Sequence, residues 1–221
     1  MLDMAKVTPQ DFLMDLGSGD GRIVITAARR GVRAMGIEYN PDMVKLSKAN
    51  GAKAGVGDKA TFLQADLFET DLSKATVITM YLLRSLNLRL RPKLLELKPG
   101  TRIVSQSFDM GDWMADQTAT VNGGRDGQFR IYFWTVPAKA DGTWQLEGGE
   151  LTLTQEFQIL RGTLTLNGKT TPISSAKMLG DQITFYSDDT IYTGRMTGNV
   201  MEGTAKSIRG GRRWKATRVN K

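Results

Sequence analysis

The chain has 221 residues and a formal net charge of +7, from 30 Lys and Arg against 23 Asp and Glu. It contains no Cys and no His. Disulfides, zinc-thiolate sites and thiol nucleophiles are therefore excluded, and the commonest general base and metal ligand is missing. Any proton transfer must use Asp, Glu, Tyr, Lys or water, and we expect no metal site.

The length suits one domain of about 140 residues and a smaller second one. No apolar run approaches the roughly 18 residues of a membrane span, and the start MLDMAKV lacks the features of a signal peptide. We therefore expect a cytoplasmic protein without a membrane span.

A glycine-rich turn, DLGSGDG at Asp15 to Gly21, follows a short apolar run and precedes a helical pattern at 23–28. Glycines at 17, 19 and 21 allow positive φ angles and a close approach of the backbone to a ligand. The next helix points its free N–H groups at the same place. The turn predicts a site for a nucleotide-like ligand, the alternative being a tight turn with a structural role alone.

The spacing of the turn distinguishes between ligand classes. The dinucleotide fingerprint G-x-G-x-x-G would need glycine at position 22, where this chain has Arg22. Asp15 and Asp20 also place negative charge where a pyrophosphate would lie, and like charges repel. A cationic ligand is therefore favoured.

The second and third expected strands are each followed by an acidic residue. Glu38 ends an expected strand at 34–37 and lies 21 residues after Gly17. A carboxylate about 20 positions beyond such a turn accepts hydrogen bonds from ribose hydroxyls, in NAD as well as other nucleosides; the alternative is a solvated strand-end carboxylate. A helix is expected from Pro41 with Asn40 as its N-cap, and a third strand at 60–63 leads to Asp66.

The next segment continues the alternation of strands and helices. A β-branched and apolar run at 76–82 suits a buried central strand of a parallel sheet, and its end carries Tyr81. An amphipathic helix over 86–97 stops at Pro99 and Gly100, and a fifth strand is expected at 101–108. The fold class predicted for residues 1–137 is a doubly wound, Rossmann-like α/β sheet.

The turn resembles motif I of the class I S-adenosylmethionine-dependent methyltransferases, whose cofactor carries a sulfonium and an ammonium. The segments GSGDGRIVI, GIEYNPDMV and YLLRSLNLRLRPKLLELKPGTRIVSQSFDMGDW make residues 5–137 similar to small bacterial methyltransferases related to the protein-lysine methyltransferases of the ATP synthase c subunit. Relatives often have Pro at the position of Arg84. They also carry a helix and a Tyr-Val-Pro-type segment before motif I, where this chain has eleven residues before Phe12, so part of the lid over the cofactor is expected to be missing or supplied differently.

The resemblance implies S-adenosyl-L-methionine as the cofactor. In the family a carboxylate at the position of Asp66 accepts the adenine amino group and the next residue, Leu67, donates its backbone N–H to a ring nitrogen; the alternative is that Asp66 is a helix N-cap. The Asn-Pro-Pro-aromatic tetrapeptide of many adenine and glutamine methyltransferases is absent, which argues against those acceptors. The predicted cofactor-binding residues are Asp15, Gly17, Ser18, Gly19, Asp20, Gly21, Glu38, Tyr39, Asn40, Asp66, Leu67 and Tyr81.

We predict methyl transfer to an amine, with a protein lysine as the first candidate. A lysine must lose its proton before attack, and an apolar, aromatic pocket favours the neutral amine. Tyr81, Asp109 and Trp113 are the predicted catalytic residues. Asp109 would orient the amine or relay its proton through water, while the two aromatic rings would form a wall and a cation–π surface. The alternative makes Trp113 a packing residue and Asp109 a turn residue.

After Pro137 the pattern changes to short alternating strands, with 138–142 as the linker. Residues 142–221 predict an antiparallel, barrel-like all-β domain with room for side chains or one small ligand. Its function is open between binding, acceptor recognition, self-association and stability alone. The expected strands are 142–146, 150–157, 159–166, 171–178, 182–186, 191–195, 200–205 and 212–218.

The charge excess lies in the last segment, because residues 206–221 hold seven basic and no acidic side chains. Those around Trp214 would contact phosphates while the indole stacks on a base, which makes RNA methylation an alternative function. In the other interpretation Trp214 fills the barrel and the basic side chains solvate an edge strand. A non-catalytic binding module is a third possibility. The basic residues are Lys206, Arg209, Arg212, Arg213, Lys215, Arg218 and Lys221.

Overall fold

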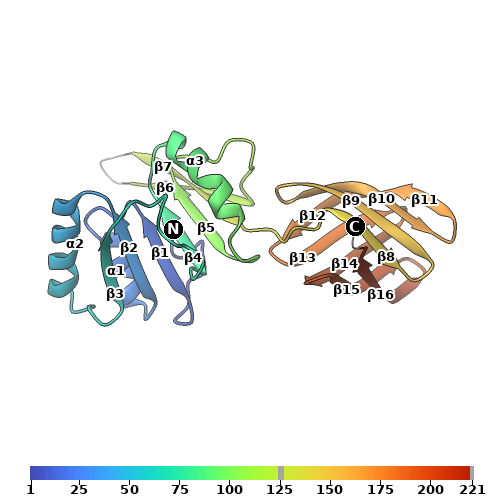
Figure 1. The fold of residues 1–221 in the computed structure, drawn as a ribbon, viewed down its shortest axis with the longest axis horizontal. Coiled ribbons are helices and arrows are strands. Elements are labelled where there is room, and N and C mark those ends of the chain that lie inside the picture. The colour runs from blue at the N-terminus through green and yellow to red at the C-terminus, as the bar shows by residue number, and fades with distance from the viewer. Residues whose placement is uncertain (124–126, 220–221) are drawn as a thin grey trace. The chain divides into compact units, whose positions relative to one another are not determined.

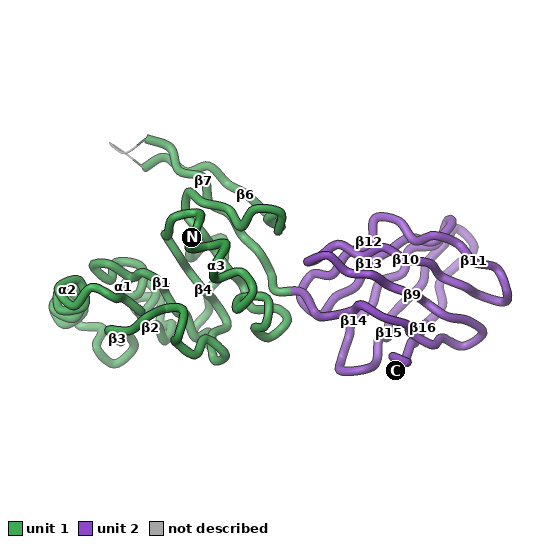
Figure 2. The backbone as a smooth tube through the Cα atoms, turned by 45° about the horizontal axis from the view of Figure 1, so that its top comes forward, with its two compact units in different colours: residues 1–136 green, residues 137–221 purple. Residues whose placement is uncertain are grey.

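The computed structural model describes residues 1–123 and 127–219 and divides into two compact units, 1–136 and 137–221 (Figures 1 and 2). Lys221, one of the predicted basic residues, lies outside the described residues. No helix in the described part of the chain is long and apolar enough to cross a membrane.

The first unit is a seven-stranded mixed sheet with helices, in the order β3-β2-β1-β4-β5-β7-β6. The five strands β1 to β5 run parallel, and β7 runs antiparallel to both β5 and β6. The Rossmann-like prediction is confirmed. The elements are β1 Phe12–Leu16, α1 Arg22–Arg29, β2 Arg33–Glu38, α2 Pro41–Lys53, β3 Ala60–Gln64, β4 Val77–Met80, α3 Arg84–Leu95, β5 Arg102–Gln106, β6 Gln117–Asn122 and β7 Gln128–Thr135.

Helices α1 and α3 lie on opposite faces of this sheet. Val24, Ala27 and Ala28 of α1 belong to one buried cluster with residues of the strands, including Val104 of β5. The next residue of β5, Ser105, points to the other face and accepts a hydrogen bond from Asn87 of α3. The strand order reverses between β1 and β4, so a ligand is expected outside the carboxyl ends of these two strands.

Several element boundaries differ from the predicted ones. β4 covers four residues rather than 76–82, because the chain leaves the sheet after Met80 and Tyr81 is exposed. β5 ends at Gln106, and α3 begins at Arg84 rather than at 86. The hairpin of β6 and β7 was not predicted, and β6 is exposed along its whole length.

The segment before β1 packs near the amino ends of the strands. Leu2 and Ala5 are buried, and Arg102 at the start of β5 donates to the backbone oxygens of Ala5 and Lys6 and pairs with Asp11. This segment therefore lies at the opposite end of the sheet from the glycine turn and provides no cover for it.

The second unit is a closed antiparallel barrel of eight strands, because β9 pairs with both β8 and β10. The barrel prediction is confirmed, with one strand divided. The predicted strand 171–178 forms two strands, separated at Ile173, and both pair with β10. The elements are β8 Gly142–Leu146, β9 Gly149–Glu156, β10 Ile159–Leu166, β11 Lys169–Pro172, β12 Ser174–Leu179, β13 Gln182–Ser187, β14 Thr190–Thr197, β15 Val200–Ser207 and β16 Gly210–Arg218.

Aromatic rings fill part of the barrel. Phe185 and Tyr192 stack with ring centroids 4.6 Å apart, and Trp214 meets both rings edge-on at 6.0 Å. Trp214 is 7% exposed, and its Nε1 donates to the backbone oxygen of Thr193. The interpretation in which this indole stacks on a nucleic-acid base is therefore wrong. The other interpretation is correct that Trp214 fills the barrel and wrong that β16 is an edge strand, since β16 pairs with β15 and with β8.

Candidate cofactor and acceptor site

The glycine turn joins β1 to α1, and its three glycines all have positive φ, between 53° and 82°. A Cβ on Gly17 would lie 2.6 Å from Leu82 Cδ2, and one on Gly21 would lie 2.6 Å from Phe62 Cε1. A Cβ on Gly19 would meet nothing within 4 Å. Two of the glycines therefore permit close packing inside the protein, while Gly19 borders open space that a ligand can occupy.

Glu38 lies directly beside Gly19, at the end of β2. One carboxylate oxygen accepts the backbone N–H of Gly19 at 3.0 Å and the other accepts that of Asn40 at 3.0 Å. Each oxygen has lone pairs left for further donors, such as the two hydroxyls of a ribose. The carboxylate is thus fixed at the carboxyl end of β2, next to the open position of the turn.

Asp15 is buried under the same turn and accepts a hydrogen bond from Thr79 Oγ1 at 2.7 Å. Burial, together with the negative charges of Glu38 and Asp20, raises the pKa of Asp15 to about 7 against the opposing effect of the hydrogen bond from Thr79. A positively charged ligand nearby would favour the ionised form of Asp15. This electrostatic environment suits a sulfonium and ammonium cofactor better than a pyrophosphate.

Other predicted cofactor residues contact their neighbours in the chain or the sheet. The Ser18 hydroxyl is buried against Gly36 and has no hydrogen-bond partner among the described residues. The Asp20 carboxylate pairs with Arg22 at 2.8 Å, and this contact lowers the pKa of Asp20. Asn40 accepts from the backbone N–H of Asp42 and caps α2, as predicted.

The predicted adenine contacts, Asp66 and Leu67, follow β3. The backbone N–H of Ala65 donates to the Glu38 carbonyl at 3.1 Å, which holds this segment beside the end of β2. Asp66 is exposed and accepts the backbone N–H of Phe68 at 2.8 Å. No helix follows Asp66 directly, so the alternative interpretation as a helix N-cap is wrong; its carboxylate holds a turn and has one oxygen left for another donor, while Leu67 is half-buried. Tyr39, after Glu38, is 77% exposed.

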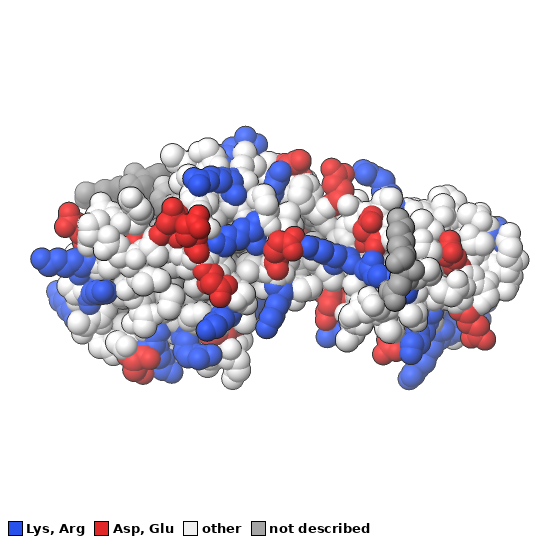
Figure 3. All heavy atoms as spheres, in the orientation of Figure 1, with Lys and Arg blue, Asp and Glu red and all other residues white. Residues whose placement is uncertain are grey.

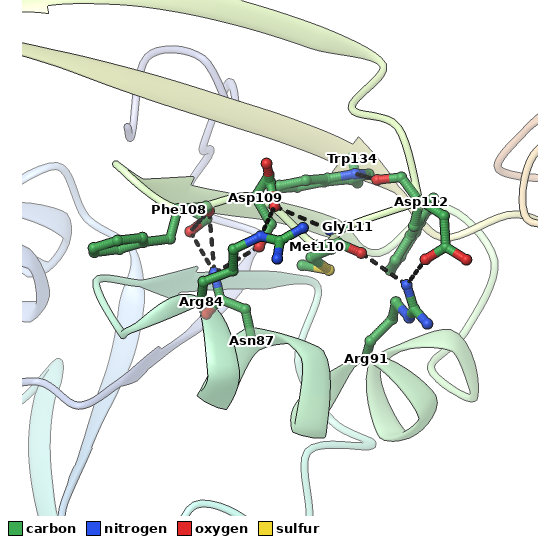
Figure 4. A network of polar contacts seen from close by, with 11 residues as sticks. Arg84, Asn87, Arg91, Phe108, Asp109, Met110, Gly111, Asp112 and Trp134 are labelled. Carbon is green, nitrogen blue, oxygen red and sulfur yellow. Dashed lines mark hydrogen bonds and ion pairs between the residues drawn. The ribbon is translucent and has the colours of Figure 1, made fainter.

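The predicted catalytic residues follow β4 and β5. Tyr81 is 56% exposed after β4. Asp109 accepts Arg84 Nε at 2.9 Å and the backbone N–H of Gly111 at 3.0 Å (Figure 4). The bond from Gly111, and then Arg84, hold the pKa of Asp109 below its usual range. Asp109 is therefore an ionised turn residue, and Arg84 and Gly111 both donate to the same oxygen, Oδ1.

Trp113 does not form the predicted wall around the amine. It is completely buried and packs on Trp134 with ring centroids 6.0 Å apart, while Trp134 Nε1 donates to the Trp113 carbonyl at 2.8 Å. A ring without exposed surface presents no face to an acceptor. The packing interpretation of Trp113 is therefore correct and its proposed place around the amine is not.

The structure adds residues of α3 that the sequence reasoning missed. Asn87 Nδ2 donates to Ser105 Oγ and to the backbone oxygens of Phe108 and Asp109, at 3.1 to 3.2 Å. Arg91 donates to the Met110 carbonyl at 2.8 Å and pairs with Asp112 (Figure 4). A sequence signal existed, because positions 84, 87 and 91 are three and four residues apart and share one helix face.

No cluster of acidic side chains able to hold a metal ion occurs among the described residues.

Comparison with known proteins agrees with this geometry. The model of the ANTKMT methyltransferase domain family matches residues 15–117. A protein-lysine N-methyltransferase of Saccharolobus islandicus is 45% identical over 62% of this chain and 86% of its own length. The lysine N-methyltransferase of the ATP synthase c subunit from Mus musculus is 37% identical over 48% of this chain, which spans less than half (43%) of that protein.

A solved structure gives a further comparison. It is that of an RNA methyltransferase from Salinibacter ruber in complex with S-adenosyl-L-homocysteine, which is 51% identical over 62% of this chain and 88% of its own, with a TM-score of 0.59. The ligand of that structure is the demethylated product of the cofactor predicted here.

Proposed function

Because the chain belongs to the class I S-adenosylmethionine-dependent methyltransferases, in the family related to the ATP synthase c-subunit lysine methyltransferases, we propose that it methylates the side-chain amine of a protein lysine. The site feature that supports cofactor use is the contact between Glu38 and the open position at Gly19. The similarity to the Saccharolobus enzyme over most of that enzyme's length supports the acceptor.

Residues at the ends of β1 and β2 would hold S-adenosylmethionine. Glu38 would accept the ribose hydroxyls, and ionised Asp15 would stabilise positive charge from beneath the turn. When bound, the cofactor supplies a methyl group that a neutral amine lone pair can accept. The family membership and the homologous methyltransferases make this protein an enzyme rather than a non-catalytic binding module.

Residues after β4 and β5 would position the acceptor. Asp109 is a weak base because its pKa is lowered, so it would orient a lysine amine by accepting a hydrogen bond and would not hold the amine's proton. The exposed ring of Tyr81 would provide an apolar surface that favours the uncharged amine. The lysine proton would then leave to water, and the rate should increase with pH.

RNA methylation is the second candidate function. It is favoured by the similarity to the Salinibacter protein, which is named an RNA methyltransferase, and by the basic side chains of β15 and β16. The burial of Trp214 is evidence against it, because base stacking on an aromatic face is a main source of single-stranded RNA affinity.

The test of the proposed function is to incubate the protein with methyl-labelled S-adenosylmethionine and a cell extract, with the Glu38→Ala variant as the control. We expect label in protein, recovered as methyl-lysine after acid hydrolysis and lost with the variant. Label recovered in RNA, and absent from protein, would overturn the lysine proposal in favour of the second candidate.

A further inference from the structure

Helix α3 contacts a second segment besides the loop after β5. This segment, residues 65–71, follows β3 and carries Asp66 and Leu67, the predicted adenine contacts. Arg89 and Lys93 of α3 bind it. Because an α-helix has 3.6 residues per turn, positions 89 and 93 lie on the side of α3 opposite to positions 84, 87 and 91, which hold the loop after β5. The two sides of one helix therefore hold two different parts of the site.

Phe68 is the residue of this segment that α3 contacts. The Arg89 guanidinium lies over its ring, with Cζ 3.7 Å from the ring centroid. Lys93 Nζ donates to the Phe68 carbonyl at 2.5 Å. A cation over an aromatic face and a charge-assisted hydrogen bond are both attractive interactions. Two cations of one helix side therefore hold the same half-buried residue, one through its ring and one through its backbone.

Phe68 is in turn joined to Asp66. Its backbone N–H donates to Asp66 Oδ1 at 2.8 Å, and the Asp66 carbonyl accepts the hydroxyl and the backbone N–H of Thr70 at 2.7 and 3.0 Å. A compact turn over residues 66–70 thus links the carboxylate to Phe68. A displacement of Phe68 would move the second carboxylate oxygen of Asp66 and the backbone N–H of Leu67 with it.

The general charge of the surface does not explain how this segment is held. Acidic and basic side chains lie next to one another over the first unit on the face shown in Figure 3. Exposed charges of both signs are screened by water and salt and fix little. The two contacts of Phe68 are different, because a cation on a ring face and an N–H on a carbonyl oxygen each define a geometry.

We propose that Arg89 and Lys93 are positioning residues for adenine recognition, which act through Phe68. They set the positions of the Asp66 carboxylate and the Leu67 N–H, and their role rests on the proposed function because it requires S-adenosylmethionine as the cofactor. Adenine has an amino group at C6 and an unprotonated N1, which match a carboxylate acceptor and an N–H donor. Hypoxanthine has an oxygen at C6 and a protonated N1, so it mismatches both groups.

The test uses calorimetry to measure the affinity of the full chain for S-adenosylhomocysteine and for S-inosylhomocysteine, in which hypoxanthine replaces adenine. The ratio of the two affinities is the readout, because a general loss of stability weakens both ligands alike. Arg89→Ala/Lys93→Ala is compared with Arg91→Ala, which removes a cation from the other side of the same helix. Phe68→Leu and Phe68→Tyr form a second pair, of which only the tyrosine keeps an aromatic face for Arg89. Circular dichroism verifies that the variants are folded.

We expect the wild type and Arg91→Ala to prefer S-adenosylhomocysteine by about 10-fold or more, because the inosine ligand leaves polar groups mismatched. The preference should fall below about threefold in the Arg89/Lys93 variant and in Phe68→Leu, and Phe68→Tyr should retain it. An unchanged preference in either of the first two variants when folded, an equal loss with Arg91→Ala, or equal binding of both ligands by the wild type would overturn the proposal. None of these results concerns the lysine acceptor, whereas binding of neither ligand by the wild type would overturn the proposed function as well.

Discussion

Three carboxylates of the first unit have different environments, and each environment suits a different task. Asp15 is buried with a pKa of about 7, Glu38 is held by two backbone N–H groups, and Asp109 is ionised beside Arg84. A buried carboxyl responds to the charge of a ligand, a fixed one recognises hydroxyls, and an ionised surface one orients an amine. Each assignment leads to a separate measurement.

Glu38→Ala should weaken the affinity for S-adenosylhomocysteine by about 30- to 1000-fold. The change removes the acceptors for two ribose hydroxyls, a loss of roughly 2 to 4 kcal/mol. Isothermal titration calorimetry measures this affinity. Glu69 has an exposed carboxylate after the end of β3, and Glu69→Ala is the control that should leave the affinity unchanged. Unchanged affinity in the Glu38 variant would exclude this residue from the cofactor site.

Asp15 should make the free energy of unfolding depend on pH. Its pKa is about 7 in the folded state and 3.8 in the reference state, so between these values the folded protein holds a proton that the unfolded chain has released. Its contribution is therefore complete below about pH 4 and is lost as the pH rises through 7. We expect a decrease on the order of 2 to 3 kcal/mol between pH 5 and pH 8.

Denaturant titrations of the wild type and of Asp15→Asn would measure this pH dependence. The other carboxylates with shifted pKa values, such as Asp11 and Asp109, are shifted downward and are already ionised at pH 5 in both states. The variant should therefore lack this decrease, while the amino group of Met1, whose pKa is lowered by burial, changes the stability in the opposite direction in both proteins. The same slope in both proteins would exclude Asp15 as its source.

Tyr81→Ala and Asp109→Ala should each lower methyl transfer by about 100-fold while cofactor affinity stays within a few-fold, because both residues would act on the acceptor alone. Asp109→Asn keeps an acceptor for the Gly111 N–H and removes the negative charge. It therefore distinguishes the effect of losing the charge from the effect of losing the hydrogen bond within the turn. The wild-type rate should rise up to about pH 9 as the acceptor amine loses its proton. A flat rate from pH 6 to 9 with active variants would argue against an amine acceptor at these residues.

At the scale of elements, α3 fixes the loop that follows β5. Its polar face carries Arg84, Asn87 and Arg91, and each donates to that loop (Figure 4). The buried indoles of Trp113 and Trp134 hold the loop from the opposite side. The position of Asp109 is therefore determined by a helix that begins 25 residues earlier in the chain.

Asn87→Asp should be more harmful than Asn87→Ala. The alanine variant loses bonds to buried acceptors, at a cost of about 1–3 kcal/mol, whereas the aspartate variant places a carboxylate against the carbonyl oxygens of Phe108 and Asp109. Thermal unfolding with bound S-adenosylhomocysteine would give the order of stability. Ser85→Ala on the exposed side of the same helix is the control. The reverse order would exclude Asn87 as the donor that holds this loop.

At the scale of the whole molecule, the two units have separate hydrophobic clusters among the described residues. The cluster of the first unit includes Leu13 and Val104, and that of the second includes Trp144 and Phe185, and they share no residue. The predicted cofactor residues all belong to the first unit. Each unit therefore has the means to fold around its own core.

Deletion of residues 142–221 should leave S-adenosylhomocysteine affinity within a few-fold of the full chain, because every predicted cofactor residue precedes Pro137. Transfer to the acceptor can decrease if the barrel takes part in recognition. Circular dichroism shows whether the fragment is folded, and calorimetry measures its affinity for S-adenosylhomocysteine. A folded fragment that no longer binds the ligand would show that the cofactor site needs the second unit.

The sequence by itself determined most of the strands and helices, apart from their exact ends and the β6–β7 hairpin, and the class of cofactor. Positive φ at Gly17, Gly19 and Gly21 is a local backbone property, and Glu38 follows from the order of strand and turn. The change to short strands after Pro137 was also visible, because alternation with a period of two is local. Single-sequence patterns are sufficient for such features, since the residues involved are neighbours in the chain.

Only the tertiary structure decided which side chains face the site. Trp113 and Trp214 have sequence contexts that suit exposed aromatic residues, yet both are buried by strands distant in the chain. Asp109 is paired with Arg84, and the exposed β6 joins the sheet through its register with β7. These contacts depend on packing between residues far apart in sequence, and local periodicity contains no information about which partner fills a given space.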